Sequence, residues 1–337
     1  MALVIAVATL GVLTVTAYAL LAGADFGGGI WDLAAHGPRR EAQRAAIATA
    51  MGPVWEANHV WLIFLIVLLF TAFPGGFGAL STALYMPFTF ALLGIVLRGA
   101  AFAFRAHARD AAGAQARWGR AFGAASVITP FFLGTAVGAV ASGRIRVVGG
   151  QVVSGFWRPW LGPFPLACGA LALALCAYLA AVYLTVETDG ALREDFRRRA
   201  LVAGGAVAVI ATIALPLARL DAPTVWAELA WGRGTPLTGA AIAISLVSLG
   251  ALRLHHYQVA RGAAVAEVAT ILWAWTTAQY PYLIVPGIRL ADAAAPRATL
   301  TAFLISAGVG MLLLLPALWL LFAVFKGKNP AAGTDRR

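Results

Sequence analysis

Charged residues are the scarcest class in this sequence. Only 12% of the 337 residues are Asp, Glu, Lys or Arg, whereas 61% are apolar, and the mean hydropathy is +0.83. A soluble domain usually has about a quarter of its residues charged, because a water-facing surface needs that coating. The composition therefore excludes an ordinary soluble domain and predicts an integral membrane protein.

Cysteine and acidic residues are also rare. Cys168 and Cys176 are the two cysteines, and both lie in one apolar run, which excludes a disulfide framework and a cysteine-rich metal or iron–sulfur site. The sequence has 14 acidic and 25 basic residues, which gives a net charge of +11. In a soluble chain this excess would suggest nucleic-acid binding, but in a membrane protein it must first be compared with topology.

Long apolar segments are what the sequence does contain. A helix needs roughly 20 apolar residues to cross the hydrocarbon core of a bilayer. Nine segments meet this requirement and predict an all-α membrane protein in which residues 1–337 form a single polytopic transmembrane domain. The expected spans are 3–22, 54–73, 79–104, 119–141, 163–186, 200–218, 236–252, 263–285 and 299–325.

The bases are divided unevenly between the two sides of these spans. Eighteen of the 25 follow odd-numbered spans. The other seven, on the opposite side, are Arg144, Arg146, Arg158, Arg219, Arg233, Arg289 and Arg297. Because cytoplasmic loops are enriched in Lys and Arg, this places the N-terminus outside and the C-terminus in the cytoplasm. Topology thus accounts for the positive charge, and no nucleic-acid partner is expected.

A few ionisable residues lie within the expected spans or at their ends. An ionisable side chain inside a bilayer costs at least ~2.5 kcal/mol, so it requires a partner, water or a function. Asp25, Glu56, Arg98 and Glu267 are all expected towards the cytoplasmic side, with Glu56 and Glu267 in the first turns of their helices. Carboxylates with one arginine at this depth suit proton uptake. Asp25, Glu56 and Arg98 are therefore the candidate proton-transfer residues.

Each of these residues also has a structural interpretation. Arg98 could extend to the lipid headgroups, Asp25 and Asp32 could end the first helix, and Glu267 could face a polar crevice. We favour the structural interpretation for Asp32 and Glu267, which remain secondary candidates, and the functional one for the other residues.

Two local patterns suggest other chemistry. The run 27–29 (GGG) follows an apolar helix rather than a strand, which favours close helix packing over a dinucleotide-binding turn. Glu56 and His59 form a Glu-x-x-His step of the kind used in di-iron bundles, but the sequence has no second copy. No metal site is predicted in this chain. His59 is a secondary candidate without a convincing axial partner for haem.

Several of these residues lie in strings that resemble a known family. Residues 23–33 (GADFGGGIWDL) and 52–63 (GPVWEANHVWLI) closely resemble the signature stretches of subunit II of cytochrome bd quinol oxidases. Residues 97–98 and 102–105, together with 278–284 (AQYPYLI), are also similar to that family, particularly to its cyanide-insensitive branch.

The resemblance implies a respiratory complex in the cytoplasmic membrane of a bacterium or archaeon. Subunit I would bind quinol and carry haem b and haem d, or haem b only. This chain would be a non-haem subunit, without catalytic residues of its own, in contact with membrane lipid. A small accessory subunit and a bound quinone are further expectations. The complex would oxidise quinol at the outer face and reduce oxygen to water with protons from the cytoplasm.

The resemblance also implies particular residue roles. Proton delivery in the family is attributed to acids in the first two helices of subunit II, which match Asp25 and Glu56, with Arg98 nearby. Some members have aspartate at the position of Glu56 and glutamine at that of His59.

The alternative function is a membrane transporter or a proton or ion channel, for which buried acids are also natural. The lack of an inverted repeat argues against it.

Overall fold

The computed structural model describes the backbone of residues 1–107 and 112–326. Within these ranges the side chains of 51–57, 105–107, 112 and 321–326 are not described. The described chain is almost entirely helical, with two short β-hairpins, β1 (Val147–Val148) with β2 (Gln151–Val152) and β3 (Tyr282–Ile284) with β4 (Ile288–Arg289). The expected all-α membrane fold is therefore confirmed at the level of fold class.

Long helices make up most of the molecule, with shorter ones between them. The long helices are α1 (Ala2–Leu33), α2 (Arg40–Ala72), α4 (Tyr85–His107), α5 (Ala112–Ala141), α6 (Pro163–Glu187), α7 (Gly190–Asp221), α9 (Thr235–Arg253), α10 (Tyr257–Gln279) and α12 (Arg297–Lys326). The short helices are α3 (Pro74–Ala83), α8 (Pro223–Trp231) and α11 (Leu290–Ala293).

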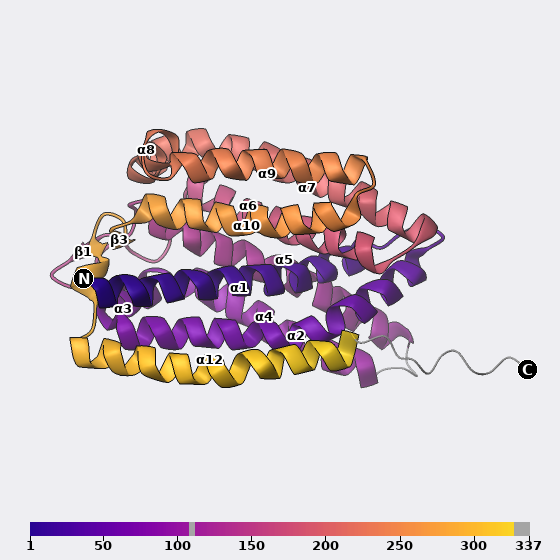
Figure 1. Ribbon diagram of the computed structural model, residues 1–337, viewed down its shortest axis with the longest axis horizontal. Coiled ribbons are helices and arrows are strands. Elements are labelled where there is room, and N and C mark those ends of the chain that lie inside the picture. Colours follow the sequence, from indigo (N-terminus) through magenta and orange to yellow (C-terminus); the bar gives the residue numbers. More distant parts are fainter. Residues whose placement is uncertain (108–111, 327–337) are drawn as a thin grey trace, which may run out of the picture.

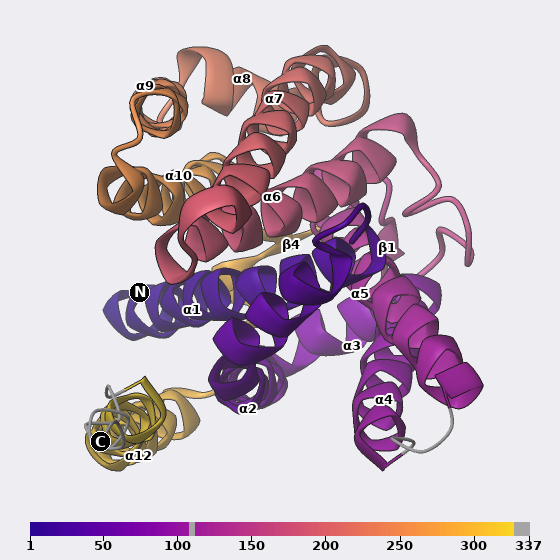
Figure 2. The same ribbon diagram turned by 90° about the vertical axis from the view of Figure 1, so that its right-hand side faces the viewer.

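The long helices lie side by side, and α1 runs between α10 on one side and α2 on the other (Figures 1 and 2). It contacts α2, α5, α6 and α10, whereas α12 lies at the periphery against α2 and α1 (Figure 2). Residues 22–29 of α1 are all buried. By contrast, Leu312, Leu313 and Trp319 of α12 are largely exposed, as lipid-facing side chains would be. The second half of α1 thus lies in the interior of the bundle.

Seven helices in the described part of the chain are long and apolar enough to cross a membrane: α1, α4, α5, α6, α7, α9 and α12. The second half of α2 and α3 meet at a bend of 119°, and they bring the number to eight if counted as one broken span. Helix α10 lies in the expected eighth span but carries Arg261 and Glu267 and is not among the seven. Nine spans, and the orientation of the termini, stay predictions.

Several expected helix boundaries are wrong. Segment 79–104 is not one helix, because the chain breaks at Leu84 between α3 and α4. Segment 263–285 is helical only to Gln279, after which β3 begins. Since α2 begins at Arg40 and α10 at Tyr257, Glu56 and Glu267 lie near the middle of their helices rather than in the first turns.

The glycine run of α1 does serve close helix packing. A Cβ atom on Gly27 would lie 1.9 Å from the carbonyl oxygen of Cys176 on α6. A Cβ atom on Gly29 would lie 2.0 Å from the Ser126 hydroxyl of α5. Both distances are far below van der Waals contact, so α1 can lie this near to α5 and α6 only with glycine at these positions.

We expect Gly27→Ala to destabilise the protein by about 1–3 kcal/mol, because the backbone of α6 would have to move. Gly205→Ala on α7 is the matched control, since nothing lies within 4 Å of the added methyl group and alanine favours a helix. Thermal unfolding of the purified protein in detergent measures both effects. Equal melting temperatures for the two variants would contradict the packing argument.

Candidate functional site

The centre of the bundle contains a buried ion pair. Both Nη atoms of Arg98 on α4 donate to the carboxylate of Asp25 on α1, and Nη2 also donates to the Asp25 backbone carbonyl at 3.0 Å. The two residues are each only 2% exposed. A two-pronged arginine–carboxylate contact is both strong and directional. It therefore fixes α4 against α1 at this depth.

Two further helices complete this site. Asn58 Nδ2 on α2 donates to Asp25 Oδ2 at 2.7 Å, and Arg98 Nε donates to Ser126 Oγ on α5 at 2.9 Å. Ser126 in turn donates to the Phe122 carbonyl at 2.8 Å. We call Asp25, Asn58, Arg98 and Ser126 the Asp25 cluster. All four residues are buried, and they come from four different helices.

Aromatic rings cover the cationic side of the Asp25 cluster. The guanidinium carbon of Arg98 lies 5.0 Å from the centre of the Phe26 ring and 4.6 Å from that of Phe122. Such rings stabilise a cation without supplying a second negative charge. The cluster thus contains one positive and one negative charge.

A second buried acid lies on the same face of α1. Asp32 follows Asp25 by two helical turns, roughly 10 Å along the axis. It is 3% exposed, and its carboxylate lies 3.7 Å from Arg44 Nε of α2. Arg44 also donates to the Asp32 backbone carbonyl at 3.4 Å. The structure thus places Asp32 at the end of α1, as the structural interpretation expected, and adds an arginine partner.

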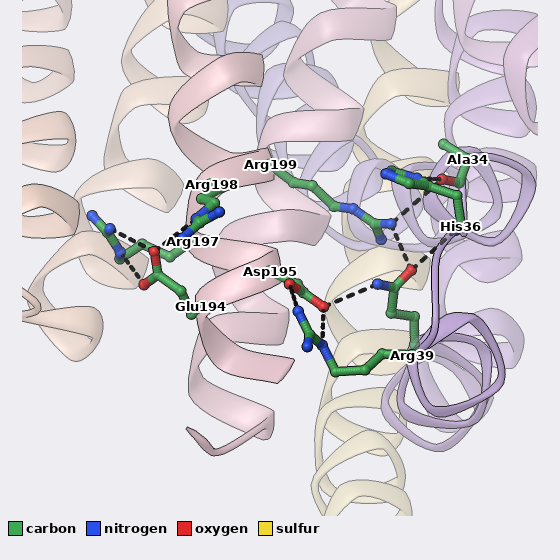
Figure 3. A network of polar contacts seen from close by, with 9 residues as sticks. Ala34, His36, Arg39, Glu194, Asp195, Arg197, Arg198 and Arg199 are labelled. Atoms are coloured by element: carbon green, nitrogen blue, oxygen red, sulfur yellow. Dashed lines mark hydrogen bonds and ion pairs between the residues drawn. The ribbon is translucent and has the colours of Figure 1, made fainter. Parts of the chain in front are cut away.

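A polar network joins this end of α1 and α2 to α7 (Figure 3). Arg199 of α7 donates to Gln43 Oε1 at 2.7 Å, Gln43 donates to Asp195 at 3.0 Å, and Arg39 donates to both oxygens of Asp195. Arg199 also lies over the ring of Trp31, 5.2 Å from its centre. These contacts attach the start of α7 to the α1–α2 connection.

The remaining candidates do not join the Asp25 cluster in the described structure. Glu56 lies in α2, but its side chain is outside the described residues. His59 is half-buried on α2. Glu267 is buried on α10, where its carboxyl interacts with Ser245 of α9 and leaves Oε2 without a hydrogen-bond partner. Asp25 and Arg98 are therefore the two candidates that the structure brings together.

The sequence matches a known family over nearly its whole length. Residues 3–325 match the family described as cytochrome bd terminal oxidase subunit II. This chain belongs to the cytochrome bd oxidase subunit II family. The identification confirms the resemblance carried by residues 23–33 and 52–63, whereas placement in the cyanide-insensitive branch stays a prediction.

Curated relatives support this subunit II assignment. The chain is 29% identical to cytochrome bd ubiquinol oxidase subunit 2 of Bacillus subtilis over 60% of this chain and 59% of that protein. It is 27% identical to cytochrome bd-I ubiquinol oxidase subunit 2 of Escherichia coli K12 over 49% of this chain and 44% of that protein. The alignments thus span less than two thirds of these relatives. A putative cytochrome bd menaquinol oxidase subunit II of B. subtilis is 21% identical, over 91% of each chain.

A solved structure has the same fold. The bd oxidase from Geobacillus thermodenitrificans matches with a TM-score of 0.82 and 22% identity, covering 98% of this chain and 100% of that one. At this identity the likeness establishes the fold. These comparisons favour an oxidase subunit II over the transporter or channel alternative.

Two members of the Asp25 cluster are absent from the sequence-based candidates. Asn58 lies inside the string 52–63, where Glu56 and His59 are the ionisable residues and an uncharged amide gives no comparable signal. Ser126 lies in an apolar span where a single hydroxyl is common. Gly29 is the residue that could have indicated the close approach of α5 to α1, because this glycine leaves the space that Ser126 occupies.

We expect Asp25→Asn to destabilise subunit II by about 3–5 kcal/mol, because it leaves the Arg98 charge buried without its partner. The double variant Asp25→Asn/Arg98→Gln removes both charges and should recover much of this loss. Thermal unfolding of the purified complex measures the difference. A double variant no more stable than Asp25→Asn would contradict the pairing argument.

Glu267→Gln is the matched control for burial alone. No Lys or Arg pairs with Glu267 in the described part of the chain, so an amide of similar shape leaves no cation unpaired. We expect a change in unfolding free energy within about 1 kcal/mol in the same assay. A loss as large as that of Asp25→Asn would show that burial of an acid, rather than its ion pair, controls stability.

Proposed function

We propose that this chain is the non-haem subunit of a quinol oxidase in the cytoplasmic membrane of a bacterium or archaeon. Its partner is subunit I, and the complex oxidises quinol and reduces oxygen to water. Family membership over residues 3–325 is the observation that carries this proposal. Two relatives are named as ubiquinol oxidase subunits and one as a putative menaquinol oxidase subunit, which supports a quinol as the reductant. A small accessory subunit and a bound quinone remain part of the proposal.

We assign the haems to subunit I, as the family resemblance implies. No group of three or more His, Cys, Asp or Glu side chains in the described part could hold a metal ion. Two cavities lined by described residues at the bundle ends measure about 250 and 330 Å³, at or below the lower limit of ordinary ligand pockets. His255 and His256 line the larger one, which lies in the connection between α9 and α10. In this proposal haem b and haem d, or haem b alone, belong to the partner, as the family resemblance implies.

We further propose that Asp25, Glu56 and Arg98 take part in delivering protons from the cytoplasmic side. The supporting observation is the position of Asp25, whose carboxylate is enclosed by α2 and α4 while Asp32 lies two turns away on the same helix face. The two acids form a sequence of exchange sites leading into the bundle. In this path Asp32 is the exchange site nearer the cytoplasmic end, with Arg44 beside it, and Asp25 is the deeper site.

Arg98 sets the charge at Asp25, the deeper exchange site. A proton that binds Asp25 takes the place of the guanidinium, which still has Ser126 and the rings of Phe26 and Phe122 as partners. When the proton leaves, Arg98 returns to the carboxylate. The two charges compensate each other while Asp25 is ionised, and in the protonated state the guanidinium keeps Ser126 and the two rings as its neutral partners. Glu56, two residues before Asn58 on α2, is the third proposed exchange site.

Oxygen consumption by the complex, driven by reduced quinol, tests the proton path. We expect Glu56→Gln and the charge-balanced variant Asp25→Asn/Arg98→Gln each to lower turnover about tenfold or more, because a missing proton carrier slows each cycle. The haem absorption bands report assembly and should be retained. Glu267→Gln should retain full turnover.

Two results would contradict parts of this proposal. Normal turnover in both test variants would remove the proton path and leave the oxidase assignment intact. A purified complex without haem bands or quinol-dependent oxygen consumption, in the unmodified protein, would remove the oxidase assignment. Adding cyanide to the unmodified complex would test placement in the cyanide-insensitive branch.

A further inference from the structure

A small cavity lies at the end of the bundle where α1 begins. It is formed by the connection between α5 and α6, which includes the β1–β2 hairpin, and by the end of α7. Its volume is about 250 Å³. The lining residues are Gly143, Arg144, Arg146, Arg158, Leu220 and Asp221. Three arginines and one aspartate give this cavity two excess positive charges.

The single acid in the cavity is already occupied. Asp221 Oδ1 accepts a 2.6 Å hydrogen bond from Arg144 Nη2, and Oδ2 accepts a 3.2 Å bond from the backbone N–H of Phe164 in the first turn of α6. The Arg144 guanidinium lies directly over Gly162, where a Cβ atom would be 2.6 Å from its carbon. Arg144 and Asp221 thus form the fixed floor of the cavity.

Arg146 and Arg158 have no such partner. Both are exposed, and neither has an acidic partner among the described side chains. Another acid at this end of the bundle, Glu228, is paired with Arg233, whose hydrogen bonds hold the pKa of Glu228 below its usual range. The excess charge of the cavity is therefore not neutralised within this chain.

Apolar side chains surround these two arginines. The same connection carries the exposed residues Val148, Val153, Phe156, Trp157 and Leu161. Leu220, on the cavity wall, is 79% exposed. Exposed tryptophan and aliphatic side chains next to arginine are typical of the layer between lipid tails and headgroups. This composition places the cavity at headgroup level, where a water-borne anion would meet a largely apolar rim.

We propose that the cavity binds the phosphate of an anionic phospholipid. The planar guanidinium groups of Arg146 and Arg158 match the paired oxygens of a phosphate diester. The excess positive charge of the site attracts an anionic lipid headgroup. The acyl chains lie along Leu220 and the exposed side of α7. The site attaches the α5–α6 connection to the outer leaflet.

The test uses the intact complex, purified in mild detergent and exchanged into nanodiscs of phosphatidylcholine containing increasing amounts of phosphatidylglycerol. Native mass spectrometry after release counts the phosphatidylglycerol that stays bound. We expect Arg146→Gln/Arg158→Gln to weaken this binding about 30-fold, since each arginine near a headgroup contributes about fivefold. Arg297→Gln is the control, because Arg297 is exposed at the same end but lies outside the cavity.

Three outcomes decide the proposal. Weaker binding in the double variant, with the control unchanged, supports it. Equal retention of phosphatidylglycerol in all three proteins overturns it, as does displacement of the lipid by millimolar inorganic phosphate, which would indicate a site for a free anion. Unchanged melting temperature and haem bands establish that the double variant is folded. None of these measurements requires the oxidase to turn over, so the result is independent of the proposed function.

Discussion

A buried charge can remain in an apolar bundle only beside a matching charge, and this requirement organises the centre of the subunit. Asp25 lies in the part of α1 that is enclosed on every side, where no bulk water can solvate it. Arg98 neutralises it, but an arginine has more donors than one carboxylate can accept. The surplus donors go to Ser126 and to the Asp25 carbonyl. One ion pair thereby fixes the mutual positions of α1, α4 and α5.

The ion pair in turn requires helices that approach closely, and glycine provides this. Gly29 leaves room for Ser126, the hydroxyl that accepts from Arg98. Gly94 lies one turn before Arg98 on α4, and a Cβ atom there would be 2.3 Å from the Thr129 hydroxyl on α5. The polar contacts and the small residues therefore occupy the same helix faces. A larger residue at either glycine would separate the groups that neutralise Asp25.

Hydropathy predicted the apolar part of each helix but not where the helices begin and end. Helix α2 begins at Arg40, far outside its apolar segment, because contacts such as Arg39 with Asp195 stabilise the polar ends in three dimensions. The break at Leu84 occurs within apolar sequence, where hydropathy gives no signal.

The Asp25 cluster, too, was predictable from the sequence only in part. Asp25 and Arg98 were predictable because a charge in an apolar run is rare and costly, so each calls for a partner. Asn58 and Ser126 were not, because an uncharged polar residue in a membrane helix is common and can satisfy itself on its own backbone. Ser126 does so through the Phe122 carbonyl and accepts from Arg98 at the same time. Only the packing of α5 against α1 shows the second contact.

Counting bases gives an orientation, but the structure shows which of them are neutralised. Near the start of α7, Arg39, Arg197 and Arg198 each pair with Asp195 or Glu194, so much of the positive charge there is compensated. At the opposite end the bases are fewer, yet Arg146 and Arg158 have no acid beside them. On the predicted outer side, where topology disfavours arginine, an uncompensated pair needs a reason beyond orientation. An external anion at that position supplies one, and the exposed apolar side chains beside it select a lipid.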